Sequence, residues 1–89
     1  MSSNVMSTWT IEEALTDIVG QKPDSQKIAN GILALCHDGM LEYGKSQLLF
    51  GIKEGNYPLT EENLCKIFKD VCGMAPDKAK SRAALVFGK

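Results

Sequence analysis

Arginine and histidine are almost absent from this chain, since each occurs once, as Arg82 and His37. The net charge is −1, so no strong overall field attracts nucleic acid. No apolar run approaches the ~20 residues that a bilayer-spanning helix needs. The first residues, MSSNVMST, contain neither a basic nor an apolar region of the kind that secretory signals have. We therefore expect a cytoplasmic protein with no membrane contact.

Cysteine is also scarce, and the three thiols of Cys36, Cys65 and Cys72 lack the dense, even spacing of a secreted disulfide scaffold. We expect reduced, buried thiols that behave as small hydrophobic groups. Cys36 and His37 are adjacent, so on a helix they point about 100° apart. Cys65 and Cys72 lie two helical turns apart, roughly 10 Å. Neither pair predicts a metal site, and the sequence predicts no cofactor.

The segment from Thr60 to Gly73 carries complete signals for one helix. Thr60 is a favourable N-cap residue, and the acidic side chains that follow it suit the positive end of a helix dipole. Gly73 can adopt the left-handed conformation that ends a helix. Between them, apolar residues recur at helical spacing and form one stripe. These residues are Leu64, Ile67, Phe68, Val71 and Cys72.

Similar patterns predict three further helices. One begins with a capping box made by Thr10 and Glu13 and ends at Gly20. A second is capped by Asp24 or Ser25 and ends near Gly39. The last follows the proline at position 76. The sequence thus predicts a compact, all-α, single-domain bundle of four to five short helices over residues 9–89, preceded by a flexible N-terminus at residues 1–8.

Residues 40–54 permit two interpretations. Our first choice is a mostly buried helix from about Lys45, although Gly44 and Gly51 each weaken a helix by about 1 kcal/mol relative to alanine. The alternative is an α+β fold with a small hairpin around residues 40–54, in which the apolar run QLLFGI is a strand. Length alone does not separate helix from strand in so short an apolar run.

One string in this region matches the phosphate-binding loop pattern G-x-x-x-x-G-K-[ST], from Gly39 to Ser46. Its interior holds Met40 and Glu42 where small residues normally let the backbone approach a phosphate. The motif also works between a parallel strand and a helix. We therefore predict no nucleotide binding. No nucleophile, base and orienting group can be assembled from the remaining residues, so the sequence predicts a protein that is not an enzyme.

Basic residues gather at the start of the last helix, where the helix dipole disfavours cations. Free backbone amides beside clustered cations can form an anion site, and phosphate is the usual anion. This pattern predicts a candidate site for nucleic acid or for a phosphorylated partner. Its members are Lys78, Lys80, Ser81, Arg82 and Lys89.

The leading functional hypothesis is a small, non-enzymatic regulator or adaptor that acts through protein–protein contacts. A small core has difficulty covering all the apolar residues between 48 and 52, and an uncovered apolar patch marks a partner site. Tyr43, Phe50 and Tyr57 are the candidate anchors by residue type. A second copy of the chain is the simplest partner, which would give a homodimer. The alternative is a DNA- or RNA-binding regulator that uses the basic C-terminal helix.

Overall fold

The computed structural model describes residues 7–88, and over this range every regular element is helical. The prediction of an all-α bundle is confirmed, and the alternative of a hairpin around residues 40–54 is wrong. A short 3-10 turn, η1, precedes the third helix. The elements are α1 (Thr8–Val19), α2 (Gln26–Leu35), η1 (Asp38–Met40), α3 (Leu41–Gly55), α4 (Glu61–Asp70) and α5 (Pro76–Phe87).

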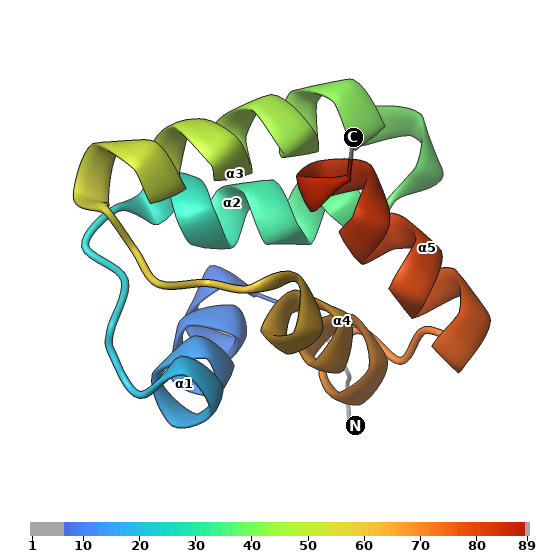
Figure 1. Ribbon diagram of the computed structural model, residues 1–89, viewed down its shortest axis with the longest axis horizontal. Helices are drawn as coiled ribbons and strands as arrows, with labels where there is room; N and C mark the ends of the chain where they lie inside the picture. Colours follow the sequence, from blue (N-terminus) through green and yellow to red (C-terminus); the bar gives the residue numbers. More distant parts are fainter. Residues whose placement is uncertain (1–6, 89) are drawn as a thin grey trace.

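Helix α2 lies at the centre of the molecule (Figure 1), between α3 on one side and α1 and α4 on the other. Helix α5 crosses the end of this arrangement and packs against α4. Large aliphatic and aromatic side chains from all five helices and the α3–α4 connection fill the space between them. The fully buried ones of greatest volume are Ile11, Leu15, Ile28, Ile32, Leu35, Leu48, Leu64, Ile67 and Phe68.

The helix starts mostly follow their capping signals. The hydroxyls of Ser25 and Thr60 accept hydrogen bonds from backbone amides at the starts of α2 and α4, as predicted. The predicted capping box at Thr10 is wrong, because Ser7 is the N-cap of α1 and accepts a hydrogen bond from the Thr10 amide. Residues 1–6 of the predicted flexible segment, and Lys89, lie outside the described residues. Ser7 and Thr8 belong to the start of α1.

Helix α1 ends at Gly20 as predicted, and Gly73 has the predicted positive φ, but α4 already ends at Asp70, three residues before Gly73. Helix α2, however, ends at Leu35 and does not continue to Gly39. The reason is the extended backbone of His37, which turns the chain into η1. This turn lets α3 begin at Leu41, one turn earlier than predicted.

Helix α3 is not mostly buried, in contrast to our expectation. Within it only Gly44, Leu48 and Gly51 are buried, and these three residues form the single stripe that faces α2. The backbones of α2 and α3 approach closely along this stripe. A Cβ atom added to Gly31 of α2 would lie 2.6 Å from the backbone nitrogen of Leu48. One added to Gly44 would lie 2.8 Å from Cγ of Leu35. The absence of side chains at these glycines is therefore what allows the α2–α3 contact.

Across the described part of the chain, no helix has the length and apolar character required to cross a bilayer.

Candidate protein-interaction surface

The outward side of α3 carries a row of large apolar side chains that the core does not cover. Met40, just before the helix, is 44% exposed, and Tyr43 and Phe50 are 51% and 54% exposed. Tyr43 and Phe50 are seven residues apart, so they lie on one side of the helix two turns from each other. The row exists because α3 packs chiefly on α2 and turns its remaining surface to solvent.

A second row, on α2, lies directly beside the first. Asn30 and Leu33 of α2, with His37 from the turn after it, line a shallow hollow of about 260 Å³ together with Met40 and Tyr43. The close approach of the two backbones at Gly31 and Gly44 brings the two rows together. Helices α2 and α3 form a helical hairpin, and we call its exposed surface the hairpin face. It is formed by Asn30, Leu33, His37, Met40, Tyr43 and Phe50.

The far end of the hairpin face is organised by Lys27 of α2. Its ammonium nitrogen lies 4.8 Å from the centroid of the Phe50 ring and 3.2 Å from a carboxylate oxygen of Glu54. The cation above the ring face is a favourable geometry, and it holds the Phe50 ring beside α2. The exposed ion pair adds little stability by itself. The hairpin face thus has an apolar middle and one charged end, where Lys27 and Glu54 neutralise each other.

Tyr57 does not belong to the hairpin face, although sequence reasoning grouped it with Tyr43 and Phe50. Its ring is buried in the core, and its hydroxyl donates a hydrogen bond of 2.6 Å to the Gln21 carbonyl. Burial raises the pKa of Tyr57 to about 12. Tyr57 therefore joins the α3–α4 connection to the turn after α1, and no exposed ring is available there for a partner.

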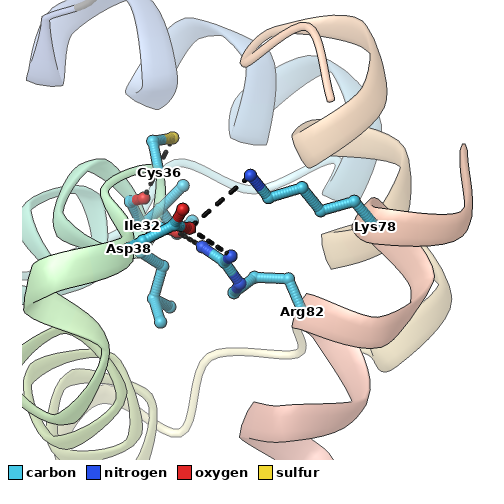
Figure 2. A network of polar contacts seen from close by, with 6 residues as sticks. Ile32, Cys36, Asp38, Lys78 and Arg82 are labelled. Atoms are coloured by element: carbon cyan, nitrogen blue, oxygen red, sulfur yellow. Dashed lines mark hydrogen bonds and ion pairs between the residues drawn. The ribbon is translucent and has the colours of Figure 1, made fainter. Parts of the chain in front are cut away.

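The predicted anion site at the start of α5 is brought together only in part, because Asp38 of η1 lies against it (Figure 2). An Asp38 carboxylate oxygen accepts a hydrogen bond of 2.7 Å from the Arg82 guanidinium and lies 3.5 Å from the Lys78 ammonium. Arg82 is buried, and its guanidinium also donates to the Leu35 carbonyl at the end of α2. The Arg82 hydrogen bond, with Lys78 nearby, lowers the pKa of Asp38. Arg82 and Lys78, two of the predicted cations, are thus already paired with the Asp38 carboxylate of the same chain.

The remaining members of the predicted anion site lie apart from this cluster. Ser81 and Lys80 are exposed, and Lys89 lies outside the described residues. Lys80 borders a wider hollow of about 680 Å³ between α4 and α5, whose lining carries charges of both signs. Its charged members are Glu61, Glu62, Lys66, Lys69, Asp70 and Lys80. This mixture gives no net positive field that would select an anion.

The string that matches a phosphate-binding loop runs through η1 and the first turns of α3. A helix, α2, precedes it where the motif needs a strand. Gly44 packs against Leu35 and Gly31, so its backbone is covered by α2 and does not face an open phosphate site. Within residues 7–88 no group of three or more His, Cys, Asp and Glu side chains is placed to hold a metal ion.

Comparison with known proteins found no matching family model, no similar curated protein and no similar solved structure. The functional argument therefore depends on the geometry of this chain.

Sequence reasoning selected Tyr43 and Phe50 but missed Leu33, Met40 and His37 of the hairpin face. Met40 was assigned to the interior of a mismatched phosphate loop. No local signal identifies them, because the packing of α2 on α3, with Gly31 against Leu48 and Gly44 against Leu35, is what brings these residues to one hollow. A contact between Cys36 and Cys72 was also missed, and no sequence spacing indicates it.

Proposed function

We propose that this protein is a small, non-enzymatic regulator or adaptor that binds another polypeptide through the hairpin face. The observation that supports the proposal is the exposed row of Met40, Tyr43 and Phe50 beside the apolar hollow of α2. An exposed group of large apolar side chains costs free energy in water, and in a small protein it marks a contact site. Tyrosine and phenylalanine supply much contact area with little conformational entropy to lose.

The first partner to consider is a second copy of the chain. In a two-fold symmetric pair the same face meets itself, so the apolar middle of one copy covers that of the other. A net charge of −1 per chain sets only a weak repulsion against such pairing. A stable interface needs about 800 Å² per partner, roughly one seventh of the 5267 Å² exposed by the chain.

Sedimentation velocity over a concentration series tests the pairing. The double variant Tyr43→Ser, Phe50→Ser should stay monomeric at concentrations where the natural chain forms dimers. The matched control is Trp9→Ser, because Trp9 of α1 is 67% exposed and lies outside the hairpin face. That control should dimerise like the natural chain.

If the natural chain is monomeric at every concentration, a different polypeptide is the remaining partner. A photo-reactive phenylalanine analogue at position 43 should then cross-link to one protein in a lysate of the native cell. The same analogue at position 9 should not. Equal cross-linking from both positions, together with a monomeric chain, would contradict the proposal.

A further inference from the structure

Two thiols from distant parts of the chain meet where α2 and α4 end. Cys36 follows the last residue of α2, and Cys72 follows α4 just before Gly73. Their sulfur atoms are in hydrogen-bond contact at 2.6 Å, and both cysteines are free thiols. Both side chains are half-buried, so small reagents in solvent can reach them. The third cysteine, Cys65, lines the hollow between α4 and α5.

The surroundings make the two thiols unequal. A hydrogen bond with Cys72 and the positive charge of Arg82 lower the pKa of Cys36, although burial opposes this. The hydrogen bond with Cys36 and burial raise the pKa of Cys72. In the protonated pair, the Cys36 thiol can donate to Cys72. It can instead donate, at 3.4 Å, to the Ile32 carbonyl, and Figure 2 shows this second contact. After Cys36 loses its proton, the Cys72 thiol can donate to the thiolate.

From this geometry we infer that Cys36 and Cys72 form a redox modification site, at which a hydroperoxide converts the two thiols into a reversible intramolecular disulfide. The Cys36 thiolate attacks the hydroxyl oxygen of the hydroperoxide, the O–O bond breaks, and hydroxide or alkoxide leaves. Cys36 is then a sulfenic acid. The Cys72 sulfur attacks it, the S–O bond breaks, and the Cys72 proton leaves with the hydroxyl group as water. Two electrons pass from the two sulfurs to the peroxide.

The new bond would connect the end of α2 to the end of α4. The two cysteines are separated by 36 positions in the sequence, so the bond would close a long loop of the unfolded chain. The thiols are already in contact when reduced, so the helices need little movement to form it. This inference is independent of the proposed function, because neither sulfur belongs to the hairpin face.

The test uses the full chain, treated with hydrogen peroxide and then with N-ethylmaleimide and trypsin. Cleavage after lysine places Cys36, Cys65 and Cys72 on separate peptides, 28–45, 54–66 and 70–78. Mass spectrometry should show peptides 28–45 and 70–78 joined, with the loss of two hydrogens, and dithiothreitol should separate them. Cys65 should be alkylated. The melting temperature should rise by about 10 °C in the oxidised chain and return on reduction.

Two variants make the result specific. Cys65→Ser keeps the proposed pair and should behave as the natural chain does. Cys72→Ala removes the resolving thiol, so peroxide should leave the Cys36 sulfur itself oxidised, as fragment ions that separate Cys36 from Met40 in peptide 28–45 would show, and the melting temperature should not rise. Three outcomes would overturn the inference: alkylation of Cys36 and Cys72 after peroxide treatment, a link that involves Cys65, or a Cys65→Ser chain that forms no disulfide.

Discussion

The two helix pairs of this protein, α2 with α3 and α4 with α5, are held together in different ways. Helices α2 and α3 meet backbone to backbone at Gly31 and Gly44, and the buried side chains of Leu35 and Leu48 pack against these glycines. Helix α4 instead buries Ile67 and Phe68 in the core, and α5 packs small residues such as Ala83 against it. Glycine contacts leave the outer side of α3 free for large apolar residues. Burial of large side chains leaves α4 with a charged outer surface.

The comparison is tested most strongly by the same substitution in both pairs. Phe68→Ala removes a fully buried ring from α4 and should lower the free energy of unfolding by about 4 kcal/mol. Phe50→Ala removes an exposed ring from α3 and should change it by less than about 1 kcal/mol, mainly through the lost contact with Lys27. Urea denaturation followed by circular dichroism measures both. Equal losses would show that α3 is held by its large side chains.

The glycine contact of α2 and α3 has its own test. Gly31→Ala should gain about 1 kcal/mol from helix propensity but lose more, because the added Cβ overlaps the Leu48 backbone. We expect a net loss of about 2 kcal/mol in the free energy of unfolding. Gly39→Ala is the control, since no atom lies within 4 Å of its added Cβ. Thermal melts should show a clear decrease for the first variant and almost none for the second.

Arg82 connects the two helix pairs, because it lies on α5 and donates to the last carbonyl of α2. Arg82→Leu leaves the buried Leu35 carbonyl without this donor and should cost about 1.5 kcal/mol of folding free energy. Lys78→Gln removes only an exposed partner of Asp38 and should cost less than about 0.5 kcal/mol. Chemical denaturation distinguishes these values. Equal losses of unfolding free energy in the two variants would show that the Arg82 hydrogen bond to α2 does not hold the two helix pairs together.

The smallest expected effect is the pH dependence that Asp38 introduces. Its pKa is lowered in the folded chain, so its ionised form stabilises the fold at pH values above its ordinary pKa of 3.8. This stabilisation is lost as the pH falls through the lower pKa of the folded state. The stability difference between the natural chain and Asp38→Asn should therefore disappear in acid, and added salt should reduce it at neutral pH. A difference that grows in acid would contradict this assignment.

Much of α4 could be predicted because its signals are local. Thr60 marks its start, Gly73 lies in the turn that follows it, and the apolar stripe gives its buried side without knowledge of any neighbour. The end of α2 and the start of α3 were predicted less well, since the extended backbone of His37 that separates the two helices has no marker in the sequence. The candidate anchors show the same division. Tyr43, Phe50 and Tyr57 are equivalent as residue types, and only their packing separates the two exposed rings from the buried one.

By itself the sequence determined the helical class, the start of α4 and the buried stripe of α4, because these depend on propensity, capping and spacing within a few residues. The tertiary structure alone decided which surface stays uncovered. It paired Gly31 with Gly44, engaged Arg82 with Asp38 and brought Cys36 to Cys72. Each of these contacts joins residues far apart in the chain, so each depends on how complete helices pack and not on any local pattern.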